Sequence, residues 1–134
     1  MSTRCQVKVS GGLNREHVTL YHHCDGYPDH ILEDITETYL RVAKTWEGYR
    51  AGKVAAHLCA THPGGFEPEE GHALHGDIEF YYQIEIGDES KPWLVIVNTV
   101  PLEGPPVEEF RAPVTEILKA HAAYSLKIAE AEAE

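Results

Sequence analysis

The chain has 134 residues and a mass of 15.0 kDa, the size of one ordinary domain with room for a hydrophobic core. With 43% hydrophobic and 25% charged residues, its composition is that of a globular protein and not of a disordered segment. The formal net charge of −11 argues against direct binding to nucleic acid, because a phosphate backbone is held by cationic groups.

Export and membrane insertion are not expected. The N-terminus has no basic region followed by an apolar run, and no stretch approaches the ~18 apolar residues that a bilayer span requires. Cys5, Cys24 and Cys59 form no Cys-x-x-Cys pair. They are interpreted as reduced, mostly buried thiols, which predicts a cytoplasmic protein with no implied cofactor.

The start of the chain predicts two strands. Apolar and polar residues alternate over 3–10 and again over 17–23, as in strands with one buried face. The connection Gly11-Gly12-Leu13-Asn14 is typical of a hairpin. These two segments are therefore expected to pair with each other.

Two helices are expected next. Asp25-Gly26 breaks the second strand because Gly tolerates positive φ, and Pro28 suits the first turn of a helix. Apolar residues then recur with the helical period over 29–46, and a shorter stripe predicts a second helix over about 50–61. His62-Pro63-Gly64-Gly65 is expected to end it.

The second half predicts a loop, two strands and a terminal helix. Residues 66–77 are polar and acidic, which indicates an exposed loop, and residues 78–86 alternate clearly. The strand 93–97 is apolar on both faces, as in a covered strand. A Pro-rich connector over 101–112 and a helix over 113–134 follow. This helix is expected to dock on the core or on a partner subunit.

The order of elements over 1–100 is β-β-α-α-β-β. Strands joined by short turns pair antiparallel, so this order predicts a single α+β domain. We expect a four-stranded antiparallel sheet with the helices packed on one face, followed by the connector and the C-terminal helix.

Negative charge is concentrated in one segment. Residues 1–65 carry seven acids and seven bases, whereas residues 66–91 carry eight acids against Lys91 alone. An electrostatic partner is therefore expected to be basic and to meet the second half of the chain. This segment also suits an acidic inhibitor that mimics nucleic acid toward a basic protein.

Several short motifs occur in a fixed order, the most specific being Tyr21-x-His23-x-Asp25-Gly26-Tyr27-Pro28 and His75-Gly76-Asp77-Ile78-Glu79-x-Tyr81-Tyr82. Over about residues 3–97 the chain resembles an uncharacterised bacterial family of small proteins from phages, integron cassettes and other mobile elements. The resemblance implies a compact α+β domain in an accessory protein of a mobile element. It implies no known activity and no catalytic residues.

The candidate binding residues come from these motifs. Tyr21 and Tyr81 are expected to share the sheet face opposite the helices, beside acidic side chains, which would form a recognition surface. His22 and His23 would point to opposite faces, so at most one joins any site. The full candidate set is Tyr21, His23, Asp25, Tyr27, His75, Asp77 and Tyr81.

No complete catalytic constellation is present in the sequence. We therefore expect a non-enzymatic binding or protein-interaction module that binds a protein partner or itself, with a small-molecule ligand left open. The alternatives are the acidic inhibitor and a small metal-dependent hydrolase using His23, Asp25, His75 and Asp77. The hydrolase requires the 25–28 turn and the 75–77 loop to meet at one site.

Overall fold

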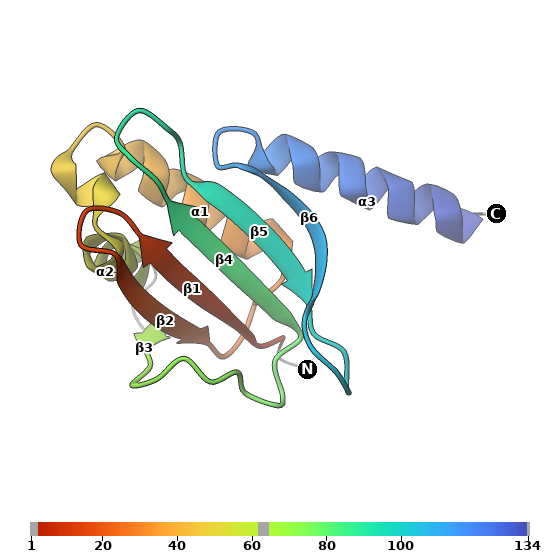
Figure 1. The fold of residues 1–134 in the computed structure, drawn as a ribbon. Helices are drawn as coiled ribbons and strands as arrows, with labels where there is room; N and C mark the ends of the chain where they lie inside the picture. Colours follow the sequence, from red (N-terminus) through yellow and green to blue (C-terminus); the bar gives the residue numbers. More distant parts are fainter. Residues whose placement is uncertain (1–2, 62–64, 134) are drawn as a thin grey trace.

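The computed structural model describes residues 3–61 and 65–133. Figure 1 shows a twisted sheet with two helices behind one face and a third helix leading away from one edge. The strands are β1 (Cys5–Gly11), β2 (Glu16–His22), β3 (Phe66–Pro68), β4 (Phe80–Ile86), β5 (Leu94–Thr99) and β6 (Val107–Pro113). The helices are α1 (Pro28–Val42), the 3₁₀ turn η1 (Trp46–Tyr49), α2 (Ala51–Thr61) and α3 (Ile117–Ala133).

The fold is α+β, but the predicted four-stranded antiparallel sheet is wrong. The sheet has six strands in the order β3-β2-β1-β4-β5-β6, and it is mixed because β1 and β4 run parallel. The β1–β2 and β4–β5 hairpins pair antiparallel, as short turns require. Between them the chain passes through α1 and α2, and this long crossover places β4 beside β1 in the same direction.

The two additional strands lie at the edges of the sheet. β3 is a three-residue strand on β2, inside a segment predicted to be a loop. β6 pairs antiparallel with β5, although residues 101–112 were expected to be a connector. Its pattern is difficult to recognise because only Phe110 and Ala112 are partly buried apolar residues in a strand that ends in proline.

The core lies between the sheet and the helices behind it. Alternate residues of β1, β2 and β4, among them Val7, Leu20 and Tyr82, are buried on the face that α1 and α2 cover. Trp93 is fully buried next to this core, its ring edge-on to Tyr39 at a centroid distance of 4.9 Å. Within residues 3–61 and 65–133, no helix has the length and apolar character needed to cross a bilayer.

The turn before α1 is built differently from the sequence expectation. Asp25, not Gly26, adopts positive φ, at 56°. Gly26 is required for a different reason, because a Cβ there would lie 2.9 Å from the Thr3 carbonyl oxygen. The Gly26 N–H donates to that oxygen at 2.9 Å, and the Tyr82 hydroxyl donates to the Gly26 carbonyl at 2.6 Å. These contacts fix the start of α1 against β1 and β4.

Tyr82→Phe is expected to change how stability depends on alkaline pH. Burial raises the pKa of Tyr82 above its usual value, so the unfolded chain ionises first as pH rises above about 10. Below that pH the contribution of the neutral buried hydroxyl is fully present. Above it, the protein loses up to about 1.4 kcal/mol per pH unit from this group.

Near neutral pH the free energy of unfolding of the Tyr82→Phe variant is about 1 kcal/mol lower than that of the wild type, because the Gly26 carbonyl loses its hydrogen-bond donor. The difference in free energy of unfolding between the two proteins should then shrink as pH passes about 10. Urea denaturation at neutral and alkaline pH measures the free energy of unfolding of both proteins. Ionisation of the other tyrosines affects both proteins equally, so it does not contribute to the difference. A difference that stays constant with pH would contradict the assignment.

Candidate functional site

The acidic loop, defined here as residues 69–77, lies on the open face of the sheet opposite α1 and α2. The Glu69 N–H donates to the Thr19 carbonyl at 2.8 Å, and the His75 N–H donates to Gln6 Oε1 at 2.9 Å. The Gln6 amide in turn donates to the Ala73 carbonyl at 3.1 Å. Gln6 is fully buried under the loop. A segment predicted to be an exposed loop is therefore fixed to β1 and β2 at both ends.

Tyr21 and Tyr81 share this open face, as the alternation predicted. In the sheet register Gln6 lies between them, opposite Tyr21 on β2 and Tyr81 on β4. Asn98 continues the row on β5 and donates to the Tyr81 carbonyl at 3.0 Å. Strands β2, β1 and β4 thus present one tyrosine ring on each side of Gln6, the residue that anchors the acidic loop.

Four of the predicted residues belong to one connected cluster. The Tyr21 hydroxyl lies 3.1 Å from His23 Nδ1, and the Tyr21 ring lies 5.0 Å from the His75 ring. Arg4, which was not among the candidates, donates from Nε to His23 Nδ1 at 3.4 Å and forms an ion pair with Asp77 at 3.4 Å. Tyr21, His23, His75 and Asp77 therefore meet at the edge of the acidic loop, with Arg4 joining two of them.

Asp25 and Tyr27 do not join this cluster in any described contact. Asp25 is exposed in its turn, and the Tyr27 ring packs against Phe80 at a centroid distance of 5.9 Å. Phe80 lies opposite Cys5 in the register, on the face that the helices cover. After β2 the chain moves to that layer to begin α1, so the neighbouring motif residues separate onto two sides of the sheet.

The acidic loop contains a shallow hollow of about 350 Å³, lined by Glu69, Glu70, Gly71, Ala73 and His75. Glu69 is held in place, because it accepts hydrogen bonds from the Gln6 amide at 3.3 Å and pairs with His75 Nε2. Glu70 is exposed beside it. The hollow therefore presents one ordered and one free carboxylate, an environment suited to a cationic group.

Tyr21 and Tyr81, on the open face of the sheet, act as neutral hydroxyl groups. Burial, and next the Asp77 carboxylate, raise the pKa of Tyr21, and burial raises the pKa of Tyr81. Both therefore keep their protons across the physiological range. They can donate hydrogen bonds and present ring faces, which are binding roles.

The residues that the hydrolase alternative requires do not form a metal site in the described structure. Across residues 3–61 and 65–133, no three His, Cys, Asp or Glu side chains gather as a metal-binding group. Burial raises the pKa of the Cys5 and Cys59 thiols, which disfavours the thiolate at these two positions. Of the three thiols, Cys5 is buried and Cys59 is partly buried, whereas Cys24 is exposed.

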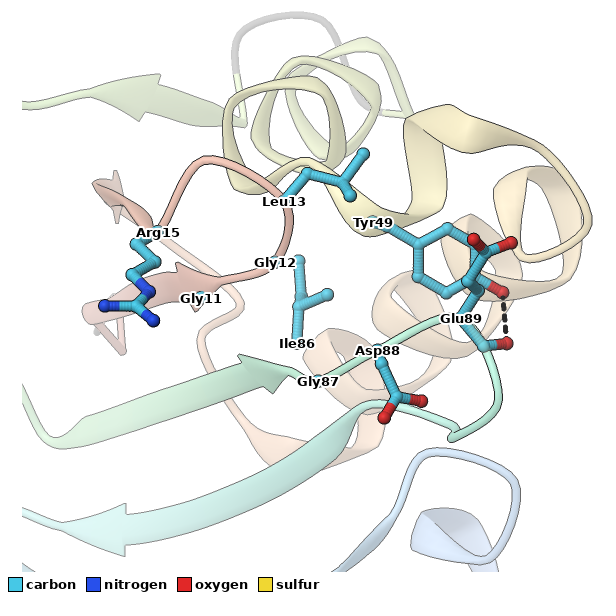
Figure 2. A pocket seen from close by; sticks show the side chains of 9 residues that line it. All are labelled: Gly11, Gly12, Leu13, Arg15, Tyr49, Ile86, Gly87, Asp88 and Glu89. Carbon is cyan, nitrogen blue, oxygen red and sulfur yellow. Dashed lines mark hydrogen bonds between the residues drawn. The ribbon is translucent and has the colours of Figure 1, made fainter.

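Sequence reasoning missed a second cavity, of about 470 Å³, at the other end of the sheet (Figure 2). It lies between the β1–β2 turn, Tyr49 and the β4–β5 turn. The Leu13 N–H donates to the Tyr49 carbonyl at 2.8 Å, and the Tyr49 hydroxyl donates to the Glu89 carbonyl at 2.9 Å. The sequence signal for this close packing was the pair Gly11-Gly12, which was interpreted only as a hairpin turn.

The acidic loop, with the tyrosines and the Arg4 cluster beside it, is the candidate functional site. Comparison of the chain with protein-family models, with curated proteins and with solved structures finds no significant match.

Proposed function

We propose that this chain is a non-enzymatic protein-interaction module of a mobile genetic element, and that it binds a basic segment of a partner protein at the acidic loop. One observation carries the proposal. The hollow lined by Glu69, Glu70 and His75 is anchored to the sheet through Gln6, next to the ring of Tyr21. The resemblance to mobile-element proteins supplies the proposed setting.

The chemistry of this surface favours lysine and arginine side chains. Five acidic residues lie in or next to the loop: Glu67, Glu69, Glu70, Asp77 and Glu79. The basic residue beside them is Arg4, whose guanidinium already forms an ion pair with Asp77. A cation that enters the hollow meets carboxylates, and a neighbouring cation can lie over the face of a tyrosine ring. The net charge of −11 attracts a basic partner before contact and gives an association rate that falls with salt.

The proposal predicts that removing two carboxylates from the hollow weakens binding of a basic peptide. The double variant Glu69→Gln and Glu70→Gln is expected to bind a Lys/Arg-rich peptide about tenfold more weakly, since each exposed ionic contact contributes about 0.2–1 kcal/mol. Fluorescence anisotropy with a labelled peptide measures the affinity. Binding should weaken further when salt rises from about 50 to about 300 mM, because exposed charges are screened.

The matched control is Glu33→Gln with Glu37→Gln. Both residues are exposed on α1, which covers the other face of the sheet, and the change in net charge is the same. This control should alter affinity less than twofold, and a polyglutamate peptide of equal length should not bind. Equal weakening by the two double variants would mean that only net charge matters, and the loop would lose its assignment.

A further inference from the structure

Helix α3 has one face docked on the protein and another face with no partner in the described chain. Phe110 of β6 lies 4.9 Å from the Tyr124 ring and 5.8 Å from the His121 ring, measured between centroids. The Tyr124 hydroxyl donates to Glu109 at 2.7 Å, and Ile117 is fully buried. These contacts hold the first two turns of the helix against β6.

A second stripe runs along the undocked side of α3. At about 100° per residue, six residues fall within a sector about 100° wide that contains no charged side chain. We call it the outer stripe: Leu118, Ala122, Ser125, Leu126, Ala129 and Ala133. All six are exposed, and Leu118 and Leu126 expose 43% and 61% of their surface. The stripe therefore leaves two leucines in water.

The end of α3 has no support from the rest of the chain. Every described residue after Tyr124 is exposed, and Figure 1 shows the helix projecting from the edge of the sheet. Residues 125–133 extend about 13 Å. They continue the docked turns of a 17-residue helix, but without packing of their own they are held only by local helical interactions. A partner on the outer stripe would supply the packing that this segment lacks.

The outer stripe is complementary to itself when two helices run antiparallel. If residue pairs are matched about the middle of the stripe, Leu118 lies level with the partner's Ala133, and the two copies of Leu126 meet beside the two-fold axis. Ala122 then meets the partner's Ala129. The two Leu126 side chains cover each other from water, and the alanine pairs permit a close approach of the two backbones. In an antiparallel pair, the positive N-terminal end of each helix dipole also lies beside the negative C-terminal end of the other, which is favourable.

Charges beside the outer stripe favour the same arrangement. Lys119 and Glu130 are eleven positions apart in sequence, which places them within about 20° of each other around the helix. In this register Lys119 of each copy lies on the same flank as Glu130 of the other, about two residues or ~3 Å from level with it. A lysine side chain spans that offset, so the dimer gains two ion pairs by symmetry. Lys119 is free to do so, since it is highly exposed and its contact with Glu116 is long, at 3.9 Å.

We propose that α3 pairs antiparallel with α3 of a second copy through the outer stripe, which gives a two-fold symmetric dimer. This inference is independent of the basic-partner proposal and stands without it. The interface is small, so the dissociation constant is expected to be micromolar, on the order of 10 μM. A dimer would carry two acidic loops and would bind a partner with two basic segments more tightly than a monomer does.

Sedimentation equilibrium of the full chain, at concentrations from about 2 to about 200 μM, covers the range on both sides of the expected dimer dissociation constant. The wild type should pass from monomer to dimer across this range. Leu126→Glu should remain monomeric throughout, and its exposure means that the fold should survive, as circular dichroism would verify. A wild type that is monomeric at the highest concentration, or a folded Leu126→Glu variant that dimerises like the wild type, overturns the proposal.

Charge reversal tests the direction of the pairing. Lys119→Glu and Glu130→Lys should each weaken dimerisation about threefold to tenfold, and the double variant should regain most of the loss. Lys127→Glu is the matched control, because it makes the same charge change on the same helix away from the outer stripe. Failure of the double variant to recover, or equal weakening by the control, rules out the antiparallel register.

Discussion

Replacing Gly12 with alanine is expected to destabilise the protein by about 3 kcal/mol or more, although the change adds one methyl group. Gly12 has φ of +79°, a conformation that alanine adopts only with strain. A Cβ there would lie 2.2 Å from the Tyr49 carbonyl oxygen, which is backbone and cannot move alone.

Relief of that contact would shift the β1–β2 turn away from Tyr49. The shift weakens two hydrogen bonds, from Gly12 N–H to the Ile86 carbonyl and from Leu13 N–H to the Tyr49 carbonyl. Each net hydrogen bond contributes about 1 kcal/mol, and strain adds a similar amount. Urea denaturation gives the free energy of unfolding of both proteins.

Gly87→Ala is the matched control, because Gly87 lines the same cavity (Figure 2). A Cβ on Gly87 meets no atom within 4 Å, so the free energy of unfolding should change by less than about 0.5 kcal/mol. A loss below about 1 kcal/mol for Gly12→Ala would show that the turn can move away from Tyr49 at little cost, contrary to the close packing described.

Replacing Trp93 with alanine is expected to cost about 4 kcal/mol or more. Removing a buried Trp side chain typically costs 3–5 kcal/mol, and Trp93 is 0% exposed. The indole Nε1–H also donates to the Gly48 carbonyl at 2.8 Å, which would lose its donor inside the protein. Because domains of this kind are stable by only about 5–15 kcal/mol, this loss removes a large share of the free energy of unfolding.

Trp46 provides the comparison within the same chain. It is 57% exposed, and its ring has the cationic groups of Lys53 and Arg50 within 5.7 and 5.9 Å. Trp46→Ala should cost only about 0.5–1 kcal/mol, the value of an exposed cation–π contact. Urea denaturation followed by circular dichroism measures the free energy of unfolding of both variants. If Trp93→Ala does not fold, Trp93→Phe, which keeps an aromatic ring in the core, takes its place in the comparison. Equal losses for the two tryptophans would contradict the burial described.

Part of the candidate site could be predicted because it depends on local pattern. Strand alternation placed Tyr21 and Tyr81 on one face, and the sheet register brings them to either side of Gln6. The participation of Gln6 and Arg4 could not be predicted. Both act through partners in the acidic loop, more than sixty positions away in sequence, and no periodic pattern identifies a contact of that kind.

The sequence alone determined the two hairpins and the helices between them, since alternation, helical period and turn residues are properties of neighbouring residues. Only the tertiary structure decided that β1 lies parallel to β4 and that β6 completes the sheet, because strand pairing across long connections depends on which buried faces fit together. The turn at Asp25-Gly26 shows both contributions. Its position follows from its residues, whereas the need for Gly26 arises from the close approach of Thr3.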